Sequence, residues 1–184
     1  MDSPTPLAAV SAGLTLRHIA IGRGTQNYTC PSTASSDVPT AVGAKATLFN
    51  ATCDAARLNV KVLTDVTKLA LNYAIPTAPE AVKRISGHHE FTDKGIPLFN
   101  LKTNLTDFGY VQAKPDAVKS AAPTDASSGK NGLGSVPWLK LNAIEGDYKE
   151  VFRVETAGGV APKTCDGITG GFSVDYSAQY WFYA

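Results

Sequence analysis

The last stretch of the chain, residues 149–184, constrains the fold more than any other part. From Gly171 to Tyr183, one set of alternate positions holds Phe172, Val174, Tyr176, Ala178, Tyr180 and Phe182. A period of two is typical of a β-strand with one face on a core, and aromatic and β-branched side chains suit such a surface. Because a chain end frays unless it is tied down, this terminus predicts a strand held in a sheet. The opposite face, which carries Gln179 and Trp181, is expected to be less buried.

Short alternating segments separated by turn-forming residues continue along most of the chain. They predict further strands over residues 14–21, 24–30, 42–49, 84–92, 96–102, 106–113, 136–142 and 150–156. One helix is expected between Asp54 and Tyr73, and Pro76 and Pro79 should end it. Its apolar stripe would hold Leu58, Val62, Val66 and Leu69. The expected fold is mainly β: an antiparallel β-sandwich or barrel with at most one or two short helices.

The length of 184 residues suits one domain with a proper core. Residues 1–13 are rich in Pro, Ser and Ala and are expected to form a flexible arm, followed by a single β-rich domain over 14–184. Residues 114–135 contain few apolar side chains and predict a long surface loop.

The charge balance and the distribution of apolar residues argue against two classes of partner. The 17 basic and 16 acidic residues leave a net charge of +1 and are scattered, so a nucleic acid is not an expected partner. No apolar run approaches the roughly 20 residues of a membrane-spanning helix, so a membrane is not an expected partner either.

Three Asn-x-Thr sequons, at Asn27, Asn50 and Asn104, lean toward secretion. In a secretory pathway each becomes a glycan acceptor on the surface. The charge-poor sequence, rich in Ser, Thr and Ala, leans the same way. We therefore expect a secreted protein, extracellular or in a cell wall.

The three cysteines, Cys30, Cys53 and Cys165, include no Cys-x-x-Cys pair, which disfavours a zinc ribbon or a redox motif. In an oxidising compartment they allow one disulfide and one leftover thiol, with three pairings open. The alternative is three buried free thiols.

His88, His89 and Glu90 are candidates for chemistry. On a strand His88 and Glu90 share one face and His89 lies on the other. His88 and Glu90 are two potential metal ligands, and a third, such as His18, would have to come from elsewhere. Two ligands are an incomplete set, so no cofactor or metal is expected. The alternative is one His buried and hydrogen-bonded and the other on the surface. No Gly-x-Ser-x-Gly elbow occurs, and no carboxylate pair stands out.

Trp138, Arg153 and Trp181 are candidates for binding. Trp138 and Trp181, with Tyr180 and Tyr183, could form an aromatic platform for a sugar or another flat ligand, or they could simply pack in the core. Arg153 could clamp a carboxylate through its planar fork, or pair with Glu155 on an exposed strand face.

Four blocks of the sequence together resemble a known family. They are Arg23–Cys30 with its Gly-x-x-x-Tyr-x-Cys pattern, Gly-His-His-x-Phe at 87–91, Pro-Trp-Leu-x-Leu at 137–141, and RVETAGGVAPKTCDG followed by YSAQYWFYA at the end. The chain resembles a family of domains of unknown function found in secreted fungal proteins and in bacteria. The resemblance implies a disulfide between Cys30 and Cys165.

Members of the family this chain resembles are often labelled malate dehydrogenase, a label that the residues do not support. A dinucleotide fold needs Gly-x-Gly-x-x-Gly between a strand and a helix. The pair Gly22 and Gly24 lacks the third glycine, and no helical pattern follows it.

The leading hypothesis is a secreted, noncatalytic fungal β-domain that binds a glycan or a partner protein at the cell surface or in its surroundings. One alternative is a metal- or carboxylate-dependent hydrolase using His88, His89 and Glu90. Another is a structural protein of a spore or wall.

Overall fold

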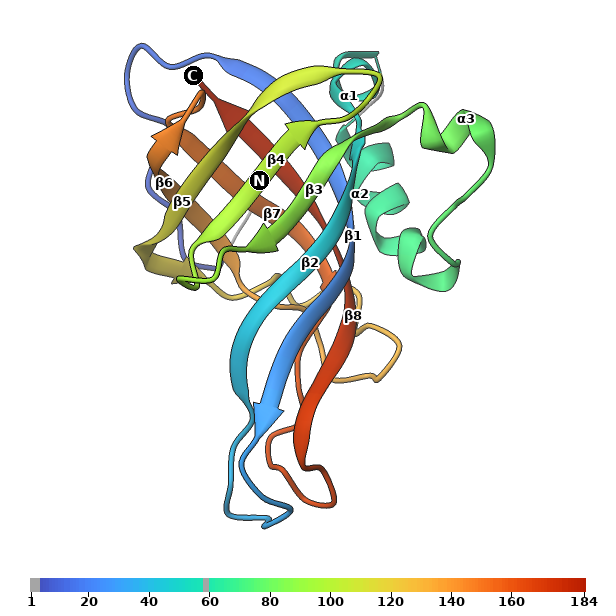
Figure 1. Cartoon of the computed structure of the whole chain (residues 1–184), viewed down its shortest axis with the longest axis vertical. Helices are drawn as coiled ribbons and strands as arrows, with labels where there is room; N and C mark the ends of the chain where they lie inside the picture. The colour runs from blue at the N-terminus through green and yellow to red at the C-terminus, as the bar shows by residue number, and fades with distance from the viewer. Residues whose placement is uncertain (1–3, 58–59) are drawn as a thin grey trace.

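The computed structural model describes residues 4–57 and 60–184, and these form a closed antiparallel barrel (Figure 1). Each strand pairs with the next, and the last pairs with the first. The strands are β1 (Leu16–Cys30), β2 (Thr40–Asn50), β3 (Ile85–Phe91), β4 (Pro97–Lys102), β5 (Asp107–Ser120), β6 (Trp138–Gly146), β7 (Glu150–Gly158) and β8 (Gly170–Tyr183). The expected mainly β fold is confirmed, in its barrel form, and the C-terminal strand lies between β1 and β7.

Two predicted strands, 14–21 and 24–30, are in fact one long strand, β1. Gly22 and Gly24 lie within it rather than at a turn. A Cβ on Gly22 would come 2.6 Å from the Tyr180 ring, and one on Gly24 would collide with the Lys45 carbonyl oxygen. These glycines let the crowded strands approach closely, which is a packing role that a turn prediction misses.

The loop expected over 114–135 begins later, because β5 continues to Ser120. After an irregularity between Pro115 and Lys119, Lys119 pairs with Leu139 and Ser120 pairs with Trp138. A proline is tolerated at such an irregularity because it need not donate to the ladder. The connection from β5 to β6 therefore covers 121–137.

The expected helical segment forms α1 (Thr52–Arg57), α2 (Val60–Leu69) and a 3₁₀ turn, η1 (Ala70–Asn72). The segment ends at Asn72, ahead of Pro76 and Pro79, as expected. Pro79 then starts a one-turn helix, α3 (Pro79–Val82), where its missing N–H costs nothing.

The predicted stripe on the α2 helix is wrong. Val62, Val66 and Leu69 are 44–52% exposed, whereas Leu63 and Thr67 are buried, and Leu58 lies outside the described residues. The helix docks through these two residues because the Thr67 hydroxyl accepts a hydrogen bond from the buried Gln179 amide of β8, at 3.4 Å.

The core fills the barrel interior. Inward side chains of β8 interlock with those of the other strands: the buried set includes Leu48, Phe99, Leu101, Val111, Leu141, Val151, Tyr176, Tyr180 and Phe182. An eight-stranded barrel is just wide enough for side chains to fill it. The outer face of β8 is buried in the middle of the strand, where Ser177 and Gln179 are 0% exposed. Helix α2 packs against β8 at this point. Asp175, Trp181 and Tyr183 on the same face are only half-buried, so this face is less buried than the inner one, as expected.

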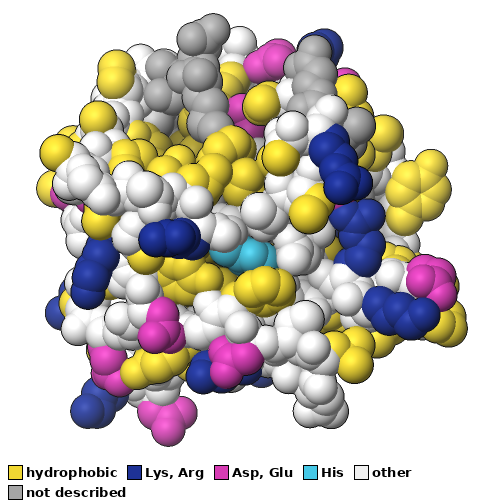
Figure 2. All heavy atoms as spheres, turned by 90° about the horizontal axis from the view of Figure 1, so that it is seen from above, with side chains coloured by type: hydrophobic (Ala, Val, Ile, Leu, Met, Phe, Trp, Pro, Cys, Tyr) yellow, Lys and Arg dark blue, Asp and Glu magenta, His cyan; other side chains and the backbone are white. Residues whose placement is uncertain are grey.

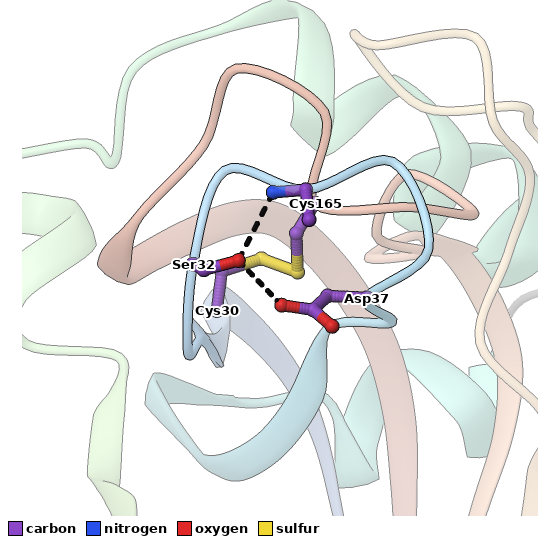
Figure 3. Close-up of a disulfide and its surroundings, with 5 residues drawn as sticks. Cys30, Ser32, Asp37 and Cys165 are labelled. Atoms are coloured by element: carbon purple, nitrogen blue, oxygen red, sulfur yellow. Dashed lines mark hydrogen bonds between the residues drawn. A yellow bond between two sulfur atoms is a disulfide. The ribbon is translucent and has the colours of Figure 1, made fainter.

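Strands β1, β2 and β8 extend below the barrel as a long tongue (Figure 1). A disulfide joins Cys30 at the end of β1 to Cys165 in the connection before β8 (Figure 3). Beside it the Ser32 hydroxyl donates to the Asp37 carboxylate at 2.6 Å. Cys53 is exposed and free, so the alternative of three buried thiols is wrong. A bridge spanning 135 residues contributes about 5 kcal/mol in the chain-entropy picture.

Seen from above, hydrophobic side chains gather toward the middle of the molecule and most charged ones toward its edge (Figure 2). Both signs of charge are present on this face, in keeping with the net charge of +1.

Candidate functional site

An aromatic groove lies on the outer wall of the barrel. Alternation along β7 and β8 turns Phe152, Val154, Trp181 and Tyr183 outward, and register places Phe152 directly opposite Trp181. Trp138, at the start of β6, completes the wall, and residues 6–10 of the N-terminal segment close the other side. The groove has a volume of about 480 Å³. Trp138 and Trp181, far apart in sequence, thus line one site.

The N-terminal segment, expected to be a flexible arm, is hydrogen-bonded to the wall over its described part. Thr5 N donates to the Ser120 hydroxyl at 3.2 Å, and the Ala9 carbonyl accepts from Lys140 Nζ at 2.8 Å. Ser11 donates to the Glu150 carboxylate through its N–H and, at 2.6 Å, through its hydroxyl. These contacts hold residues 6–10 over the aromatic side chains.

A buried ion pair anchors the segment. Lys140 Nζ lies 2.8 Å from Glu150 Oε1, and each side chain is 6% exposed. Burial by itself would raise the pKa of Glu150, but hydrogen bonds from Lys140 and Ser11 outweigh it and lower the pKa below its ordinary value. Glu150 therefore stays ionised and holds the segment in place.

The two tryptophans differ in their polar edges. Trp181 Nε1 donates to Gln179 Oε1 at 3.0 Å, so this hydrogen bond fixes the orientation of the half-buried ring. Trp138 is 2% exposed, and its Nε1–H has no hydrogen-bond partner among the described residues. A buried indole N–H usually finds a partner. The Nε1–H of Trp138 is therefore a donor that a ligand could use.

His88, His89 and Glu90 do not converge. On β3, His88 and Glu90 are exposed and face outward, whereas His89 points into the barrel. The His89 ring stacks on Phe99 at 4.2 Å, and its Nδ1 donates to the Leu98 carbonyl at 2.9 Å. Burial lowers the pKa of His89 to about 4. Over residues 4–57 and 60–184, no three His, Cys, Asp or Glu side chains gather as a metal site would require.

His18, the suggested third ligand, is buried elsewhere. Its ring stacks on Phe108 at 4.7 Å, and Nε2 lies 3.0 Å from the Ser86 hydroxyl. Burial lowers the pKa of His18 to about 4, so it is a neutral core residue at ordinary pH.

Arg153 lies on the inner side of β7, and the expected surface pair with Glu155 does not form. The backbone of Glu155 has a φ of 49°, and the pairing of β7 with β8 shifts between Val154 and Ala157. This bulge turns Glu155 to the outside, beside Thr64 and Lys68 of α2. Arg153 instead donates from Nη2 to the Pro137 carbonyl at 2.8 Å and lines a small cavity with His89 and Tyr180.

The three sequons differ in exposure. Asn104 is exposed in the turn between β4 and β5. Asn27 and Asn50 are half-buried, and their amide oxygens accept hydrogen bonds from Ser173 and from the Thr52 N–H. Asn104 is therefore the most accessible of the three predicted acceptors.

Other features of the groove had weaker signals in the sequence. Phe152 could have been found from its alternation with Arg153 in β7. The part played by residues 6–10 had no signal, because nothing in a short apolar segment says which wall it covers.

None of the described helices is long and apolar enough to cross a membrane. The sequence model of a family described as "Protein of unknown function (DUF3455)" matches residues 10–184. No curated protein and no solved structure matches the chain. Since the match covers nearly the whole chain, the chain belongs to this family.

Proposed function

We propose that this member of the DUF3455 family is a secreted, noncatalytic domain that binds a glycan in the aromatic groove. The proposal rests on one observation: four aromatic side chains line the same groove of about 480 Å³. They are Trp138, Phe152, Trp181 and Tyr183. Flat aromatic rings with polar edges suit the apolar faces and hydroxyl rims of sugars.

Because the barrel interior is filled, only the outer wall has room for a large ligand. The interior is packed with aromatic and aliphatic side chains, so a ligand of oligosaccharide size must bind outside it. The groove is also built on rigid strands, and the Lys140–Glu150 pair anchors the segment that closes it. Such a site needs little reorganisation on binding, which favours affinity.

Secretion is supported by the Cys30–Cys165 disulfide, because such bridges persist in oxidising compartments. The accessible sequon at Asn104 points in the same direction.

Binding is favoured over turnover by the placement of the catalytic candidates. His89 lies inside the barrel with a stacked, hydrogen-bonded ring, while His88 and Glu90 lie outside. The wall of the barrel separates them, so these three residues do not act on one substrate atom.

The test is a titration with soluble hexasaccharides of β-1,4-glucose, β-1,3-glucose and β-1,4-N-acetylglucosamine, followed by tryptophan fluorescence and calorimetry. At least one is expected to bind saturably, and Trp181→Ala is expected to weaken it about tenfold or more, since removing an aromatic stacking contact costs of the order of 1–3 kcal/mol. Tyr73→Ala is the matched control, because Tyr73 is an exposed aromatic residue away from the groove. Absence of binding by all three, or equal binding by Trp181→Ala, would contradict the proposal.

A protein partner is a second candidate, favoured by a different observation. Val62, Val66 and Leu69 of α2 and the nearby Tyr73 are all at least 44% exposed. Val66, Leu69 and Tyr73 line an apolar hollow of about 520 Å³ against β1 and α1. Clustered exposed apolar residues of this kind often mark protein contacts. A pull-down from culture fluid that is lost in Val66→Asp but kept in Trp181→Ala would assign a partner to this surface.

A further inference from the structure

A small cavity lies on the axis of the barrel, separate from the outer groove. Each of the eight strands contributes to its lining, and its volume is about 60 Å³. The polar side chains in the lining are Gln26, His89, Arg153 and Tyr180. Phe91 and Leu139 in the same lining are only half-buried, so the cavity reaches solvent at this end of the barrel.

Two hydrogen-bond donors in this lining are unused. Gln26 is 8% exposed, and its Nε2 is buried with no partner among the described residues. Arg153 Nε is also buried without a partner in that part of the chain. Nearly all buried hydrogen-bond donors in proteins have a partner. Two unused donors in one lining indicate a site for a hydrogen-bond acceptor.

The charge of the lining is positive. The positive charge is the guanidinium of Arg153. Among residues 4–57 and 60–184, no Asp or Glu forms an ion pair with Arg153. The cavity lining itself holds no carboxylate. His89 adds no charge near neutral pH, since burial lowers its pKa to about 4, and its Nδ1–H is used by the Leu98 carbonyl. Tyr180 shares a hydrogen bond of 2.8 Å with Tyr176.

The rest of the lining is apolar and limits what fits. It consists of Ala44, Phe91, Pro97, Phe99, Pro115, Leu139 and Leu141. A guanidinium and an amide donor match the planar oxygens of a carboxylate, and the apolar wall suits a short carbon chain. We propose that the barrel axis binds a small monocarboxylic acid, with the carboxylate held by Arg153 and Gln26.

The test uses NMR on the intact protein, following the Arg153 Nε–H and Gln26 Nε2–H resonances. The probes are sodium acetate and sodium propionate, with acetamide, phosphate and chloride at matched ionic strength as controls. Saturable shifts of both resonances are expected with acetate and propionate, with propionate at least as tight. Acetamide has the same shape but no charge and is expected to cause no saturable shift.

Arg153→Gln is expected to weaken propionate binding about tenfold or more, because it removes a charge-assisted hydrogen bond. Arg17→Gln is the matched control, since Arg17 is exposed and its variant should bind as the parent does. The native titration decides the matter even if Arg153→Gln folds poorly. Equal shifts with acetamide would show that the site does not select a carboxylate, and no shift with either acid would show that water satisfies these donors. Either result would overturn the proposal. The glycan titration above does not involve this cavity, so the two proposals fail independently.

Discussion

The two faces of β8 are both buried in the middle of the strand, but for different reasons. Its inward residues Tyr176, Tyr180 and Phe182 are 0–1% exposed and form the centre of the core. Its outward residues Ser177 and Gln179 are also 0% exposed, yet they are polar and are covered by α2. Burial on the inner face follows from alternation and barrel closure. Burial on the outer face depends on one short helix, so the two faces should respond differently to mutation.

The largest effect is expected for the inner face. Phe182→Ala should lower the free energy of unfolding by about 3–5 kcal/mol, since it removes a fully buried ring from a closed barrel that cannot collapse around the space. Urea unfolding measures this. A loss below about 1 kcal/mol would mean that the interior is loosely packed.

Two buried histidines that contact the inner face of β8, His18 beside Phe182 and His89 beside Tyr180, should also make stability depend on pH. Burial lowers the pKa of His18 and His89 to about 4, whereas an unfolded His has a pKa of about 6.5. Between these values the unfolded chain binds more protons, so stability is complete above about pH 6.5 and falls as the pH drops toward 4. The loss is up to about 3 kcal/mol per histidine.

Urea unfolding at pH 7, 5.5 and 4.5 checks this dependence. His89→Gln should reduce the dependence without abolishing it, because one of the two buried titrating groups is gone and His18 remains. His88→Gln, at the exposed neighbouring position, should leave the slope as it is. A parent protein with the same stability at pH 7 and 4.5 would contradict the buried, neutral state of these rings.

A smaller effect is expected where α2 meets the outer face. Thr67→Val should cost about 1–2 kcal/mol, because it leaves the buried Gln179 Nε2 without its partner. Thr67→Ser retains the hydroxyl and is the matched control. If Thr67→Val and Thr67→Ser change the unfolding midpoint equally, the Thr67 hydroxyl does not hold α2 on the barrel.

The smallest effect is expected on the exposed side of the same helix. Val66 is 46% exposed, so Val66→Gln should change the free energy of unfolding by less than about 0.5 kcal/mol. The result sharpens the comparison, because Thr67 and Val66 are neighbours in sequence. A loss above about 1 kcal/mol would show that the predicted apolar stripe does pack in solution.

The candidate sites were predictable only in part. The sequence grouped Trp138 and Trp181 with Tyr180 and Tyr183, and three of the four line the groove, whereas Tyr180 points into the barrel. Arg153 stood out as a charged side chain in an apolar strand, but nothing in the sequence indicated its neighbours. Register brings Trp181 beside Phe152, and barrel closure puts Arg153 opposite His89 and Gln26. Gln26 had no signal, since one polar residue in a strand says nothing about which donors stay unpaired.

Alternation in the sequence by itself determined the β class, the C-terminal strand and the opposite sides of His88 and His89, because a period of two depends only on local backbone geometry. The tertiary structure decided the rest. It joined two predicted strands through Gly22 and Gly24, turned Glu155 outward at a bulge and covered the polar face of β8 with α2. These outcomes depend on which neighbour a side chain meets across the barrel, and that is set by closure of the whole sheet rather than by any local pattern.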